Sequence, residues 1–88
     1  MTPDGKRFVA RVLVYPRAEV LDPQGRAIEG ALERIGFDGV QRIRAGKSFE
    51  VALRAASSTE ASEAVDRMCR HLLANPIVED YSVEWIRA

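Results

Sequence analysis

The feature that most constrains the fold is a nine-residue stretch, Arg7–Tyr15, with the β-branched and aromatic content of a strand. One face of this strand is wholly apolar and consists of Phe8, Ala10, Val12 and Val14. The other face is nearly as apolar and consists of Val9, Arg11, Leu13 and Tyr15. Such a strand is normally central in its sheet and covered on both faces. Because a chain of 88 residues has room for only one layer of helices, we expect a second copy to cover the second face.

A helix with signals at both ends follows this strand. Asp22 is a favourable N-cap, Pro23 suits the first helical position, and Gly36 can close the helix with a positive φ. The apolar residues between these ends form one stripe, which consists of Ala27, Ile28, Ala31, Leu32 and Ile35. Gly30 interrupts the helix at a cost of roughly 1 kcal/mol relative to alanine. It indicates either the close approach of a neighbouring backbone, of this chain or another, or a tolerated imperfection.

Two strands are predicted next, over residues 40–45 and 48–55. Gly46-Lys47 between them is either a short hairpin turn or a bulge within one long bent ribbon. The second of these strands alternates cleanly, with four inward side chains, Phe49, Val51, Leu53 and Ala55.

A second helix begins at Ser57, which has capping-box spacing to Glu60, and it ends at Asn75-Pro76. The last strand is predicted over residues 77–86. Its side chains expected to face the helices are Ile77, Tyr81, Val83 and Trp85.

The order βαββαβ predicts an α+β fold, the ferredoxin-like plait. In this fold a four-stranded antiparallel sheet carries both helices on one face. The first strand should lie between the third and the fourth, with the third beside the second. Residues 1–6 are expected to be a flexible lead, and residues 7–88 a single domain.

Composition excludes several classes of function. The chain carries 13 basic and 13 acidic residues, a balance that argues against binding to nucleic acid or to an anionic membrane. A single cysteine, Cys69, excludes a disulfide framework, and the sequence has neither a long apolar run nor the apolar core of a signal peptide. We therefore expect a cytoplasmic protein.

No residue pattern predicts catalysis. His71 is the only histidine and is interpreted as a helix-terminal cation, whereas Cys69 lies on a buried stripe without a nearby base. Gly46-Lys47 lacks the flanking glycines and the hydroxyl residue of a phosphate-binding loop. The plait occurs in proteins with many different activities and therefore does not predict one. A small-molecule-binding regulatory dimer of the ACT type is an alternative.

Several stretches together resemble one family, PurS, the small subunit of phosphoribosylformylglycinamidine (FGAM) synthase. The stretches that carry the resemblance are residues 20–32, 36–40, 44–47, 68–69 and 72–81, of which Leu-Asp-Pro-Gln-Gly and Ala-Asn-Pro-Ile-Val-Glu-Asp-Tyr are specific. The resemblance implies a non-catalytic subunit in purine biosynthesis. Such a subunit bridges a glutaminase (PurQ) and a synthetase (PurL) and assists the passage of ammonia from glutamine.

The same resemblance implies that this chain holds no cofactor, since ATP and magnesium are expected on the large synthetase subunit. It also implies self-association as a dimer or tetramer. We assign self-association to the second face of the first strand, that is, to Val9, Arg11, Leu13 and Tyr15. Contacts with the large subunits are assigned to two polar stretches, Asp22, Pro23, Gln24 and Gly25, and Arg42, Arg44, Gly46 and Lys47. For Asp22 and Pro23 the alternative role is helix initiation.

Overall fold

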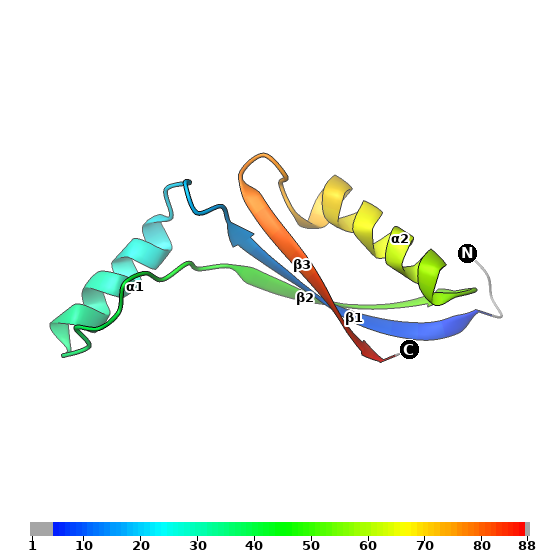
Figure 1. Cartoon of the computed structure of the whole chain (residues 1–88), viewed down its shortest axis with the longest axis horizontal. Helices are drawn as coiled ribbons and strands as arrows, with labels where there is room; N and C mark the ends of the chain where they lie inside the picture. The colour runs from blue at the N-terminus through cyan, green and yellow to red at the C-terminus, as the bar shows by residue number, and fades with distance from the viewer. Residues whose placement is uncertain (1–4, 88) are drawn as a thin grey trace.

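A computed structural model describes residues 5–87 of the chain. The elements follow the order β1 (Lys6–Pro16), α1 (Pro23–Arg34), β2 (Lys47–Ala55), α2 (Ser58–Met68), η1 (Cys69–Leu73) and β3 (Glu79–Arg87). Figure 1 shows two parts, a twisted sheet with α2 on one face and an arm that carries α1 away from it. The α+β class is confirmed. Of the predicted lead 1–6, residues 1–4 lie outside the described residues and Lys6 already belongs to β1.

The sheet has three antiparallel strands in the order β2-β1-β3. The prediction that the first strand is central is confirmed. Val12 marks the register, because it lies opposite Phe49 of β2 and Val83 of β3. Side chains of these three residues therefore share the face that carries α2.

The core lies between this face and α2. Its fully buried large side chains are Val12, Val14, Val65 and Cys69. The partly buried apolar side chains that pack against them are Phe49, Val51, Leu53, Leu73, Tyr81 and Val83. The predicted inward faces of the last two strands are thereby confirmed, except at Ile77. Ile77 is 81% exposed and precedes β3. Its N–H donates a hydrogen bond to Asn75 Oδ1, which holds it in the turn between η1 and β3.

The prediction of a fourth strand over residues 40–45 is wrong for the described chain. This segment is extended but pairs with no strand among residues 5–87. Gly46 makes no hairpin, so the segment runs on into β2 without turning back (Figure 1). The hairpin alternative is therefore wrong, and the bulge within one long ribbon is not observed either, because residues 40–45 form no strand and lead into β2 as unpaired chain.

The prediction that both helices cover one sheet face is also wrong. Helix α1 projects beyond the sheet and makes no extensive contact with another helix or strand (Figure 1). The described chain measures 54 × 25 × 14 Å, with a radius of gyration of 16.9 Å. A compact chain of this length would have a radius of gyration of about 12 Å. The stripe of α1 is consequently left open, and Ile35 is 71% exposed.

The local signals at the helix ends are confirmed. Asp22 caps α1, and Gly36 adopts a φ of 105° just after the helix, where the N–H of Phe37 donates to the carbonyl of Leu32. The hydroxyl of Ser57 caps α2 by accepting from the N–H of Glu60 at 3.2 Å. No helix within residues 5–87 is long and apolar enough to cross a membrane.

Candidate functional site

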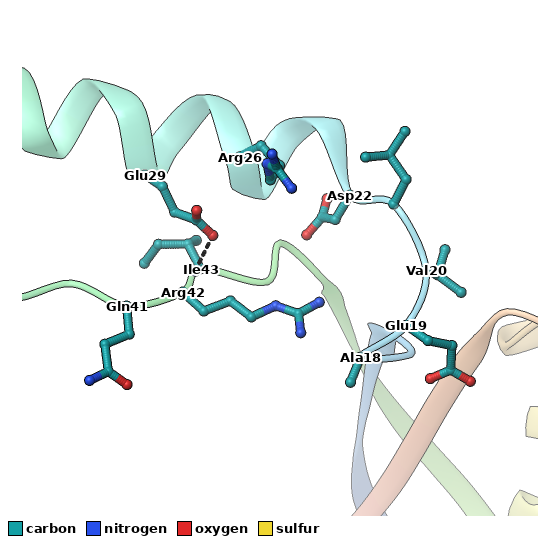
Figure 2. A pocket seen from close by; sticks show the side chains of 10 residues that line it. Ala18, Glu19, Val20, Asp22, Arg26, Glu29, Gln41, Arg42 and Ile43 are labelled. Carbon is teal, nitrogen blue, oxygen red and sulfur yellow. Dashed lines mark hydrogen bonds between the residues drawn. The ribbon is translucent and has the colours of Figure 1, made fainter.

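The arm, defined as residues 17–46, is held together by carboxylates rather than by an apolar core. Asp22 accepts from the N–H of Gly25 at 3.1 Å, which caps α1, and from the N–H of Ala45 at 2.8 Å. Two turns later Glu29 accepts from the N–H of Ile43 at 2.7 Å (Figure 2). These bonds fasten the extended segment 41–45 along the helix. The backbone donors from Ala45 and Gly25 lower the pKa of Asp22, because both stabilise its ionised form.

Two glycines allow the arm its close approaches. A Cβ on Gly25 would lie 2.2 Å from the carbonyl oxygen of Ile43, and one on Gly46 would lie 2.3 Å from the carbonyl oxygen of Val14. Neither position has space for a side chain. Gly25 and Gly46, which were assigned to contacts with the large subunits, therefore have a structural role in this chain: they allow two backbone segments to approach closely.

Arginine side chains anchor the base of the arm to the sheet. Arg44 donates to the carbonyl of Pro16 at 3.1 Å and lies over the Tyr15 ring, 5.4 Å from its centroid. Arg17 donates to the carbonyl of Pro76 at 2.9 Å and approaches Asp80 at 3.6 Å. Both ends of the arm are therefore tied to the sheet or to the turn before β3.

Three of the predicted partner-contact residues, Pro23, Gln24 and Arg42, are exposed and make no hydrogen bond within residues 5–87 through their side chains. Lys47 is also exposed, but its ammonium group lies 3.9 Å from Glu79 and 6.0 Å from the centre of the Phe49 ring. The structure brings Asp22 and Arg42 to one hollow and leaves Lys47 at the start of the sheet.

That hollow is a cavity of about 440 Å³ between the loop 18–22, the first half of α1 and residues 41–43 (Figure 2). Its charged lining mixes both signs and consists of Glu19, Asp22, Arg26, Glu29 and Arg42. The oxygens of Asp22 and one of Glu29 are already occupied by backbone N–H groups. The hollow therefore has the character of a polar contact surface rather than of a pocket that selects one small anion.

The second face of β1 is not covered by α2, which lies on the opposite face of the sheet (Figure 1). Along this open face Val9 is 7% exposed, Leu13 is half-buried and Tyr15 is 37% exposed. Arg11 is exposed and lies opposite Glu50 on one side and Glu84 on the other. The structure thus places the four predicted self-association residues together.

The residues that could have supported catalysis do not form a site. Cys69 is fully buried, and burial raises the pKa of its thiol. His71 lies exposed in η1. Asp66 accepts from the hydroxyl of Tyr81 at 2.6 Å and pairs with Arg70 at 3.0 Å, so its carboxylate is used in holding α2 to β3. Within residues 5–87 no group of three or more potential ligands could hold a metal ion.

Sequence reasoning missed the roles of Glu29 and Arg17. Glu29 lies on the polar side of α1 and Arg17 lies in a loop. Neither residue belongs to a sequence pattern that predicts its hydrogen-bond partner. Their partners, Ile43 and Pro76, lie 14 and 59 residues away and become neighbours only in the folded chain.

The described residues form a small α+β protein with an open sheet face and an arm on which apolar side chains are exposed. Residues 9–87 match the PurS family, described as phosphoribosylformylglycinamidine (FGAM) synthase. The chain belongs to this family, which confirms the resemblance drawn from its sequence, and the prediction that it is an accessory subunit of FGAM synthase is confirmed with it.

Individual relatives and a solved structure support this family assignment. The FGAM synthase subunit PurS of Synechocystis is 43% identical over 77 residues, which cover 88% of this chain and 77% of the relative. The Bacillus subtilis subunit is 38% identical over 88% of this chain and 90% of the relative. A chain in the structure of PurLQS from Thermotoga maritima superposes with a TM-score of 0.85 at 34% identity, covering 92% of this chain and 99% of that one.

Proposed function

We propose that this chain is the non-catalytic subunit that bridges a glutaminase (PurQ) and a synthetase (PurL) in de novo purine biosynthesis. In this role it assists the transfer of ammonia from glutamine to formylglycinamide ribonucleotide, which is converted to the amidine at the expense of ATP. The observation that carries the proposal is the similarity, over nearly the whole chain, to a chain of PurLQS from Thermotoga maritima. ATP and magnesium would be held by the synthetase subunit.

The arm supports this role by offering a surface that its own fold leaves unused. Exposed apolar side chains are spread along it, and they include Leu21, Ile28, Ile35, Phe37 and Val40. Large exposed apolar areas rimmed by charge are typical of contacts between proteins. Among the predicted contact residues, we assign the direct contacts to Pro23, Gln24 and Arg42. Asp22, Gly25, Arg44 and Gly46 would act by holding the arm in shape.

Self-association through the open sheet face is part of the same proposal. Of the four predicted residues, Leu13 and Tyr15 have apolar surface that a second copy would cover, whereas Val9 is only 7% exposed in the single chain. Arg11 lies beside them, opposite Glu50 and Glu84 of its own sheet. The test is Leu13→Asp, which should lower the oligomeric state in light scattering without changing the circular dichroism spectrum. An unchanged oligomer would contradict this placement.

The test of the function is a glutamine-dependent amidotransferase assay on the two large subunits, with and without this chain. Activity should appear only when the chain is added, and the chain alone should show none. If addition changes nothing and no complex forms, the bridging role is excluded. A thermal-shift screen of small metabolites would then test the alternative, the ACT-type regulatory dimer.

A further inference from the structure

The direction of the arm relative to the sheet is set at the base of the arm. The arm leaves β1 after Pro16 and returns to β2 at Lys47, so its two ends lie at neighbouring strands. Helix α1 makes no extensive contact with another described helix or strand (Figure 1). Where two parts of a chain meet only at a narrow connection, a few residues at that connection determine how the parts are oriented.

The turn before β3 and the first residue of β3 contact both ends of this base. At the first end, the N–H of Arg17 donates to the carbonyl of Val78 at 2.9 Å, and its guanidinium donates to the carbonyl of Pro76 at 2.9 Å. At the second end, the ammonium group of Lys47 lies 3.9 Å from the carboxylate of Glu79. The base of the arm is therefore held against one short stretch of chain.

The turn is itself fixed by hydrogen bonds between its own residues. The N–H groups of Val78 and Glu79 both donate to the carbonyl of Asn75, at 3.1 and 2.8 Å. The Asn75 Oδ1 accepts from the N–H of Ile77 at 3.1 Å, and the carboxylate of Glu79 accepts from the N–H of Asn75 at 2.7 Å. The carbonyl groups that hold the base of the arm therefore belong to a preorganised turn.

The bond to Pro76 is the close contact of the Arg17 side chain. The Arg17 Nε is buried without a hydrogen-bond partner among residues 5–87, and it lies 3.6 Å from Asp80, which is too long for a hydrogen bond. The side chains of Arg17 and Asp80 are 41% and 64% exposed, so water screens their attraction. A lysine at position 17 would keep the charge but would lack the planar guanidinium that reaches the carbonyl.

We propose that Arg17 is a positioning residue, which fixes the direction of the arm and thereby aligns the two large subunits for the transfer of ammonia. The proposal rests on the proposed bridging function. A chain that bridges two partners contacts them through separate surfaces, so the angle between the arm and the sheet region sets how the partners face each other. Loss of the Arg17 contacts would let ammonia escape to water, while the chemistry of both large subunits would continue.

The first test uses this chain alone and measures the direction of the arm. Spin labels are attached at Glu33→Cys on α1 and Ser62→Cys on α2, two exposed positions, while Cys69 is fully buried. Double electron–electron resonance on labelled chain diluted in unlabelled chain measures the distance within one molecule. The distance distribution should be narrow with Arg17 present and should broaden or shift in Arg17→Ala.

Matched variants separate the bond to the carbonyl from the charge. Arg17→Lys should resemble Arg17→Ala, whereas Asp80→Asn should keep the wild-type distribution because Asp80 makes no close bond. Arg70→Ala removes a 3.0 Å surface ion pair on η1, away from the arm, and should also leave the distribution unchanged. Circular dichroism checks that each variant is folded. Wild-type distributions in both Arg17→Ala and Arg17→Lys would overturn the proposal.

The second test measures the transfer of ammonia in the complex with the two large subunits. The glutamate released per amidine formed should rise at least about twofold when Arg17→Ala or Arg17→Lys replaces the wild-type chain. Activity with ammonium chloride in place of glutamine should stay unchanged, because free ammonia does not depend on the alignment. An unchanged ratio in both variants would contradict the positioning role. A complex that does not need the wild-type chain at all would instead contradict the bridging function, which the distance measurement does not use.

Discussion

The sheet with α2 and the arm are two regions of one short chain held by different forces. In the sheet region, apolar side chains such as Val12 and Val65 are fully removed from water. In the arm, carboxylate-to-backbone bonds from Asp22 and Glu29 hold α1 to the extended segment, while apolar side chains stay exposed. Burial of apolar side chains therefore holds the first region, whereas polar bonds hold the second and leave its apolar side chains exposed. The same kind of substitution should therefore destabilise the sheet region strongly and the arm only slightly.

The largest contrast is expected from a carboxylate placed in each region. Val65→Asp buries a charge among apolar neighbours and should abolish the folded state, because an unpaired buried charge costs several kcal/mol. Ile35→Asp places the same charge at an exposed site of the arm and should change the stability of the single chain by less than about 1 kcal/mol. Circular dichroism checks the fold. Unfolding of Ile35→Asp to the same extent would show that the arm and the sheet region fold as one unit.

Two glycines of α1, Gly25 and Gly30, should respond in opposite ways to substitution by alanine. Gly25→Ala places a Cβ against the carbonyl oxygen of Ile43 and should destabilise the arm by about 1–3 kcal/mol. Gly30→Ala meets only Arg34, at 3.6 Å, and should stabilise the helix by roughly 1 kcal/mol through propensity. Thermal unfolding of the wild type and the two variants measures the order of their stabilities. A destabilising Gly30→Ala would instead indicate that another chain's backbone lies against this position.

Asp22 makes the arm sensitive to acid. Its pKa is lowered by the N–H groups of Ala45 and Gly25, so its contribution to stability is complete above the ordinary aspartate pKa of about 3.9 and is lost as the pH falls below it. The protection factors of the Ala45 and Gly25 amides against hydrogen exchange should fall in that range, before those of amides in β1. Asp22→Asn should show faster exchange at neutral pH and no such acid step. An acid step that persists in Asp22→Asn would assign the effect to another group.

The smallest effect is expected where α2 meets β3. Tyr81→Phe removes the 2.6 Å hydrogen bond to Asp66 and should cost about 0.5–1.5 kcal/mol. The same bond raises the pKa of Tyr81, so its contribution is present below the ordinary tyrosine pKa of about 10 and is lost as the pH rises past the raised value. Denaturant unfolding at neutral and alkaline pH checks both statements. An equal difference between wild type and Tyr81→Phe at the two pH values would exclude the pKa effect.

Local signals in the sequence predicted much of this structure. The alternation in β1 and in residues 48–55, the caps at Asp22 and Ser57 and the closing glycine at Gly36 all act over a few residues, and all are observed. The candidate surfaces were predicted only in part. Val9, Leu13 and Tyr15 share a face by the period of a strand, whereas the bonds of Glu29 and Arg17 join residues that are distant in the sequence.

Periodicity, capping and motif are properties of neighbouring residues, so the type of nearly every element, the central place of β1 and the membership of the PurS family could be predicted from the sequence. That the chain passes through Gly46 without turning back, and that α1 leaves the sheet, became clear only from the folded chain. The residue types of 40–45 are the same whether the segment pairs with its own sheet or lies along a helix. The close approach of Gly46 to Val14 and the bonds from Asp22 and Glu29 made that choice, and each depends on residues brought together by folding.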